Sequence, residues 1–231
     1  MADIITYAPT VQAIQAYAYD TAQIAKMWAT NGGPAAEIAA YRQFPDWSVM
    51  PRLPDGQLLS DGQVQVDTSG AGSVALAAGG QDALLAVVGG GTATLTGGSG
   101  GTDILLADVA NGGPTTLNAG SGNDYLYGGA GNNTFVDNTG SNYMQGGTGA
   151  NTFTFADAHS GHDIIGNFHI GTDVLNIAAN LNGNGIITAL ELIASATVGN
   201  GNTVLHLSGN DDITMIGITN PSSLLASIAI L

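Results

Sequence analysis

A nine-residue period in a glycine-rich stretch constrains the fold more than any other feature of this sequence. From Gly120 the chain reads GSGNDYLYG, GAGNNTFVD, NTGSNYMQG and GTGANTFTF. The third position of each unit is glycine, the fifth is Asp or Asn, and the seventh is a large apolar residue. The fifth positions are Asp124, Asn133, Asn142 and Asn151, and the seventh are Leu126, Phe135, Met144 and Phe153. A disordered segment would not keep large apolar side chains in phase over this distance, so the period predicts a repeat structure.

The nonapeptide predicts a turn followed by a short strand. Glycine supplies the backbone angles of a tight turn, and the apolar residue of the strand points inward. Two units make one coil, and stacked coils bury a continuous core. The apolar positions continue toward the N-terminus at wider spacings, through Leu117, Leu105, Leu95, Leu85 and Leu76. We therefore expect a mainly β fold, a right-handed parallel β-roll (a β-solenoid) over residues 70–160, with these side chains in one core.

Composition divides the chain into three parts. Residues 70–160 hold 22 of the 35 glycines, a share of about 24% against a usual level of about 7%. Residues 1–69 are predicted to form a small helical unit at 10–41, a proline-containing connection and a strand at 63–67. Residues 161–231 are predicted to form a β-rich cap, with strands near 163–177, 203–207 and 212–218 and a helix near 188–195.

The charge balance favours metal cations as partners. The chain has 18 acidic and three basic residues, and no Lys or Arg follows Arg52. Such a surface cannot neutralise phosphates, so we expect neither nucleic acid nor anionic membrane as a partner. Cysteine is absent, so bound metal or repeat stacking must replace disulfides as the staple. The first residues lack the pattern of a signal peptide, and no apolar stretch is long enough for a membrane span.

Three segments resemble RTX (repeats-in-toxin) proteins. Residues 119–129, AGSGNDYLYGG, resemble their calcium-binding nonapeptide, and residues 163–175, DIIGNFHIGTDVL, look like the segment that closes the β-roll in serralysin-type domains. Residues 211–218, DDITMIGI, and the apolar end SIAIL are similar to their type I secretion terminus. The resemblance implies a protein exported by type I secretion machinery to the extracellular space or cell surface, with calcium as its cofactor.

In that family, calcium lies between successive turns and is bound by Asp carboxylates and glycine-turn carbonyls. Carried onto this sequence, the candidate ligands are Asp82, Asp103, Gly120, Gly122, Asp124, Gly129, Gly131, Asn133, Asp163 and Asp173. Asp103 stands one place out of step with the nonapeptide count. Only Asp124 keeps the carboxylate of the regular repeats, and Asn offers one neutral oxygen. Two alternatives stay open: at least one filled calcium site, or a calcium-free roll with an amide ladder of stacked Asn side chains.

A second calcium candidate lies in residues 180–191, which fit the EF-hand loop template. Asn180, Asn182 and Asn184 occupy the first three donor positions, and Glu191 occupies the twelfth. Since all three usual Asp positions are Asn, the loop carries a single formal charge. The alternative, which we favour, is an Asn-Gly turn leading into a helix that Thr188 caps and Glu191 supports.

No catalytic constellation stands out. The chain has neither an HExxH motif nor a G-x-S-x-G motif, and we expect His159, His162 and His169 to be surface or turn residues. Three functions remain: a non-catalytic structural or surface protein able to self-assemble, a calcium-dependent module for a cell-surface glycan, or an enzyme whose first 69 residues carry the chemistry. The last is the weakest because those residues lack a nucleophile paired with a base. A groove lined by aromatic residues and calcium would favour the glycan module.

Overall fold

The computed structural model describes residues 4–7, 63–70, 73–80, 83–107, 112–156, 161–208 and 211–231. The expected helical unit at residues 10–41 and the candidate ligand Asp82 lie outside the described residues. The strand expected at residues 63–67 is present as part of β2 (Gln63–Gly70).

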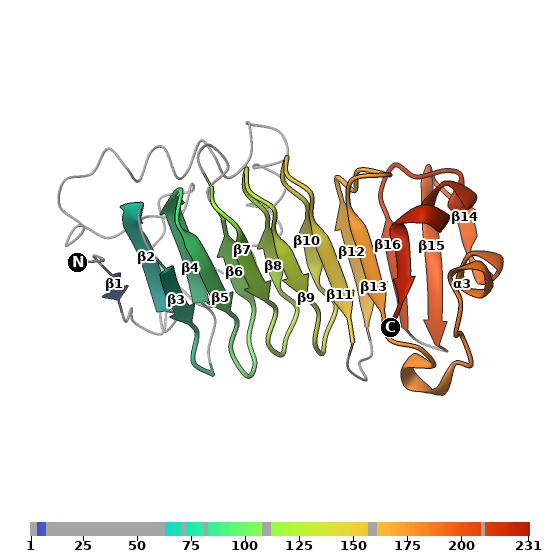
Figure 1. The fold of residues 1–231 in the computed structure, drawn as a ribbon. Coiled ribbons are helices and arrows are strands. Elements are labelled where there is room, and N and C mark those ends of the chain that lie inside the picture. Colours follow the sequence, from blue (N-terminus) through green and yellow to red (C-terminus); the bar gives the residue numbers. More distant parts are fainter. Residues whose placement is uncertain are drawn as a thin grey trace.

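The described strands form two long sheets that face each other along the molecule (Figure 1). The first sheet contains, in spatial order, β1 (Ile4–Tyr7), β2, β4 (Ala83–Gly89), β6 (Asp103–Leu106), β8 (Tyr125–Tyr127), β10 (Tyr143–Gln145), β12 (His162–Gly166), β16 (Asp211–Met215), β15 (Asn202–Ser208) and β14 (Thr197–Gly199). The second contains β17 (Ile228–Ile230), β13 (Val174–Ile177), β11 (Thr152–Phe155), β9 (Thr134–Val136), β7 (Thr115–Asn118), β5 (Thr92–Thr96) and β3 (Ser73–Ala77). From β2 to β13 the chain alternates between the sheets, and neighbours within each sheet are parallel, which defines a parallel β-solenoid.

The core consists of apolar columns, one for each sheet. Leu126 and Met144 are paired in the first sheet, and Leu117, Phe135 and Phe153 follow one another in the second. All five are completely buried, which confirms the predicted register. The rings of Phe135 and Phe153 stack with centroids 4.6 Å apart and planes 7° from parallel. The earlier, less regular positions are also in the core: Leu76, Leu85, Leu95 and Leu105.

Glycine columns allow the turns of successive coils to approach each other. Gly122 and Gly140 have φ angles of 138° and 122°, which glycine adopts far more readily than other residues. A Cβ atom added to Gly140 would meet the carbonyl oxygen of Gly122 in the preceding coil. At Gly147 a Cβ would meet the carbonyl oxygen of Gly129 in the same way. The glycine period is therefore required by contact between coils as well as by backbone angle.

The C-terminal part continues both sheets and closes the end of the roll, as Figure 1 shows. Strand β16 pairs in parallel with β12, and β17 pairs in parallel with β13. Strands β15 and β14 turn back through Asn200 and Gly201, both at positive φ. Helix α3 (Ala189–Ser195) and the 3₁₀ helix η2 (Pro221–Ser227) bury Leu192 and Leu224 against this end. The expected strands and helix of the cap are present. Among the described residues, no helix has the length and apolar character that a membrane span requires.

We expect Gly140→Ala to lower the free energy of unfolding by about 2 kcal/mol or more, because the new Cβ meets backbone and the φ angle is unfavourable. Gly100→Ala is the matched control, since a Cβ there meets nothing within 4 Å; its expected effect is within about 0.5 kcal/mol. Urea denaturation measures both variants. Equal losses would show that the close approach at Gly140 does not limit stability.

Candidate calcium site

The turns that precede the strands of the first sheet form a side-chain ladder, here named the carboxylate ladder (Asp103, Asp124, Asn142 and Asp163). The backbone N–H of each member donates to Oδ1 of the next. The donor–acceptor distances are 2.8 Å from Asp103 to Asp124, 2.9 Å from Asp124 to Asn142 and 2.7 Å from Asn142 to Asp163. All four residues are buried. The ladder thus fixes the alignment of each coil with the next.

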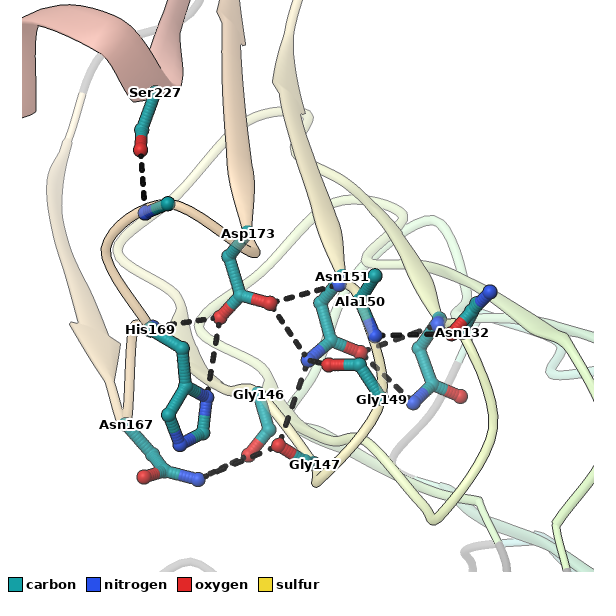
Figure 2. A network of polar contacts seen from close by, with 12 residues as sticks. Asn132, Gly146, Gly147, Gly149, Ala150, Asn151, Asn167, His169, Asp173 and Ser227 are labelled. Atoms are coloured by element: carbon teal, nitrogen blue, oxygen red, sulfur yellow. Dashed lines mark hydrogen bonds and ion pairs between the residues drawn. The ribbon is translucent and has the colours of Figure 1, made fainter.

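The turns on the opposite edge form a second ladder, here named the amide ladder (Asn133, Asn151 and Asp173). The N–H of Asn133 donates to Oδ1 of Asn151 over 3.1 Å, and the N–H of Asn151 donates to Oδ1 of Asp173 over 2.8 Å. Oδ2 of Asp173 accepts the N–H of His169 at 2.8 Å. Figure 2 shows these contacts following one another from coil to coil.

In the amide ladder, side-chain NH₂ groups already occupy the space among the turn oxygens. Nδ2 of Asn151 donates to the carbonyls of Gly149 and Gly147 and to Oδ1 of Asp173, over 2.9, 3.5 and 3.2 Å (Figure 2). Nδ2 of Asn133 makes the equivalent contacts with Gly131, Gly129 and Asn151. These are the carbonyl oxygens that a cation between the turns would need, so this edge is stabilised without one. Oδ1 of Asn133, at the first rung, is buried without a hydrogen-bond donor among the described residues.

The carboxylate ladder differs because a carboxylate has no N–H to donate. Toward the cap it meets two further buried acids, Asp137 and Asp211. Nδ2 of Asn142 donates to Asp137 Oδ1 and Nδ2 of Asn182 donates to Asp211 Oδ2, each over 2.8 Å. No N–H or hydroxyl of the described chain donates to Oδ2 of Asp163. The negative charge of Asp163 acts on the carboxyl group of Asp137, which favours a proton on one of the two.

Burial and like charge raise the pKa values of this pair. Burial, and then the negative charge of Asp163, raise the pKa of Asp137 to about 9. Burial raises the pKa of Asp163 to about 7, against the lowering effect of the hydrogen bond from Asn142. Asp211 raises both pKa values further. Protons or a bound cation would each relieve the repulsion among these acids.

The residues of the carboxylate edge fit calcium. Calcium prefers six to eight oxygen ligands, and this edge combines buried carboxylates with glycine-turn carbonyls. Within the described part of the chain, no three or more His, Asp or Glu side chains are arranged as a ready metal cluster. A bound ion would therefore have to take main-chain carbonyls as well as side chains, which is how the resemblance to RTX repeats assigns its ligands.

The structure divides the candidate ligands between the two edges. Asp103, Asp124 and Asp163 lie on the carboxylate edge, with Gly120 and Gly122 in the turn that precedes Asp124. Gly129, Gly131, Asn133 and Asp173 lie on the amide edge. Whether calcium binds at any of them stays a prediction.

Asp103 is in step with the ladder, although the nonapeptide count placed it one residue out. Neighbouring rungs are 18 residues apart between Asp124 and Asn142 but 21 apart between Asp103 and Asp124. The extra residues lie in the turns of the longer coil, so the strands remain aligned. Asp137 and Asp211 were missed by sequence reasoning. Asp137 carried a signal, because it stands where the units before and after have Gly128 and Gly146.

The EF-hand-like segment is organised by hydrogen bonds of its own. Oδ1 of Asn180 accepts the N–H of Gly185, and Oδ1 of Asn184 accepts that of Ile186, both over 2.8 Å. Glu191 completes a capping box with Thr188 at the start of α3. These contacts lower the pKa of Glu191, chiefly through the N–H of Ile187. Glu191 therefore acts as a helix-capping residue here, and Asn182 links the loop to Asp211.

One family model and one solved structure are similar to this chain. Residues 109–136 and 136–165, about a quarter of the chain, match the family model of the RTX calcium-binding nonapeptide repeat. No curated protein matches the sequence. Among solved structures, the extracellular lipase LipA from Serratia marcescens is similar over 77% of this chain, with 16% identity and a TM-score of 0.41. The match covers 41% of the lipase chain.

The chain therefore carries RTX calcium-binding nonapeptide repeats, and they lie within a parallel β-solenoid. RTX nonapeptide repeats bind calcium, and the proteins that contain them are typically secreted.

The raised pKa values predict how the metal-free protein responds to pH. Above pH 3.8 the folded state holds protons that the unfolded state has lost, on Asp163 up to its pKa of about 7 and on Asp137 up to its pKa of about 9. The free energy of unfolding must therefore fall as pH rises through this window. In chelator, we expect a lower melting temperature at pH 8 than at pH 5, and a smaller difference in Asp137→Asn. A melting temperature that rises over this range would contradict the buried pair.

Proposed function

We propose that this protein is a secreted, calcium-stabilised structural or surface-associated β-roll, and that the roll itself is not catalytic. The observation that carries the proposal is the contrast between the two ladders. One edge is held largely by Asn amide groups, and the other collects buried acids, two of which have raised pKa values. Calcium at the carboxylate edge would complete a staple that runs the length of the roll and replaces the missing disulfides.

The contacts that the described histidines make with neighbouring side chains support a structural role. Nδ1 of His162 contacts Asp212 at 2.9 Å, and Nδ1 of His169 contacts Asp173 at 3.5 Å. Nε2 of His206 lies 3.0 Å from Oγ1 of Thr197. The contacts of His162 and His206 each join two strands, and that of His169 lies within the turn between β12 and β13. The described histidines are therefore used to hold turns and strands together.

The distribution of exposed apolar residues supports attachment through the cap. The large apolar side chains that are exposed in the described part of the chain all lie at or beyond residue 170: Ile170, Val174, Ile187, Leu190, Val198, Ile216, Leu225 and Leu231. Strand β14 is exposed throughout and forms the edge of the first sheet. We propose that this end contacts a second copy or a surface, whereas the roll acts as a rigid spacer.

Calcium is expected to raise the melting temperature and to bind mainly at the carboxylate edge. A ligand present at a hundredfold excess over its dissociation constant stabilises the native state by about 2.7 kcal/mol. Asp124→Asn keeps the Oδ1 acceptor and removes a charge, so it should reduce both the gain and the calcium affinity measured by calorimetry.

Asp173→Asn makes the same change in the amide ladder and serves as the matched control, with little expected effect on calcium affinity. An identical melting temperature in calcium and in chelator would contradict the proposal and favour a roll held by hydrogen bonds alone. Equal losses in the two variants would contradict the assignment of calcium to one edge.

Export is proposed to depend on residues 161–231. Low cytoplasmic calcium would leave the acidic roll loosely folded for passage, and millimolar calcium outside would favour folding. A reporter protein fused to residues 161–231 should appear in the medium of cells that express type I secretion machinery. The same reporter fused to residues 112–156 should stay inside. Equal amounts of both fusions in the medium would contradict this assignment.

A further inference from the structure

A groove on the outer face of the first sheet combines aromatic rings with a row of neutral polar groups. It has a volume of about 320 Å³ and lies over β8, β10 and β12. Tyr125 and Tyr143 occupy the same register position on the parallel strands β8 and β10, and Ile164 follows on β12. The two rings are 6.2 Å apart and tilted by 39°. Both tyrosines are partly exposed, so the sheet presents them to a ligand.

The polar wall of the groove is a third ladder, formed by Asn123, Ser141 and His162. Oδ1 of Asn123 accepts the N–H of Ser141 at 2.8 Å, and Oγ of Ser141 accepts the N–H of His162 at 2.9 Å. These contacts use oxygen acceptors, so the Asn123 NH₂ group and the Ser141 O–H can donate outward. One such residue stands on each coil, at the strand spacing of about 4.8 Å.

The charge of the groove restricts the class of ligand. The described residues that line the groove include no Lys or Arg, and the one histidine among them, His162, already contacts Asp212, so an anionic ligand would find little positive charge there. The carboxyl group of Asp124, which also lines the groove, is buried in the carboxylate ladder. Burial raises the pKa values of Tyr125 and Tyr143, so both phenols stay neutral donors at physiological pH. Apart from the imidazole of His162, which contacts Asp212, the accessible groups are therefore uncharged hydroxyl, amide and aromatic groups.

We propose that this groove binds a neutral glycan. A pyranose ring has an apolar C–H face and a rim of hydroxyl groups. The face suits the tyrosine rings, and the rim suits Asn123 and Ser141. The groove volume lies at the lower end of the range of about 300–1,000 Å³ for small-ligand sites, enough for a short stretch of sugar units. A lipid or apolar peptide would leave the polar ladder unmatched.

The test measures binding of the full chain to soluble neutral oligosaccharides of glucose, galactose and mannose by calorimetry, in saturating calcium. An acidic oligosaccharide of galacturonic acid forms the anionic arm. Binding of at least one neutral oligosaccharide, and a loss of affinity of about tenfold or more in Tyr143→Ala, are expected. Tyr143→Phe should retain most of the affinity, because it keeps the ring face. Thr134→Ala, on the outer face of the second sheet, is the control and should bind as the unaltered protein does.

The proposal is overturned if no neutral oligosaccharide binds, if only the acidic one binds, or if the double variant Tyr125→Ala/Tyr143→Ala binds unchanged. Circular dichroism and calcium titration of each variant show whether the roll is intact. Loss of sugar binding with calcium binding preserved is therefore distinguished from failure of the calcium staple.

Discussion

The hydrogen bond from a backbone N–H of one coil to the side-chain Oδ1 of the next is the interaction on which the rest of this structure depends. It recurs on both edges, between Asp124 and Asn142 and between Asn133 and Asn151. These two bonds join residues 18 positions apart, and other rungs join residues 21 or 22 apart, so the bond aligns successive coils even where a turn is longer. In that alignment Leu126 stacks on Met144 and Phe135 stacks on Phe153. The apolar core and the close approach of the glycines follow from the same alignment.

The ladders also show how one atom changes the chemistry of an edge. Asn and Asp accept the same N–H bond, but only Asn brings an NH₂ group that can donate to the turn carbonyls. Where Asn stands, as at Asn151, the turn oxygens are satisfied by protein. At Asp163 no such NH₂ group is present, and burial raises the pKa values of this carboxyl group and of Asp137. Protons or a bound cation would stabilise such a buried pair.

Much of this architecture could be predicted from the sequence, because the apolar period is a local signal. The core columns and the strands of the cap were found from spacing alone. The register of Asp103 was not, because turn length varies while strand alignment is kept. The proximity of Asp137 and Asp211 could not be predicted from the sequence either. It depends on β16 pairing with β12 after the chain has passed through the helix and hairpin of the cap. The tyrosine groove required knowledge of which residues point outward on adjacent coils.

The inward and outward residues of a strand share the same pairing with the next coil, but different requirements act on their side chains. On β8 and β10 the inward residues Leu126 and Met144 are completely buried, so only side chains that fill the core are tolerated there. Their neighbours Tyr125 and Tyr143 point to the opposite face, because side chains alternate along a strand. The carboxylate ladder, which aligns the core residues of successive coils, therefore also aligns the rings of Tyr125 and Tyr143. The fold does not require these two outward residues to be tyrosine. Outward positions can thus change with the ligand while the fold is kept, which makes this surface the part of the roll best suited to recognition.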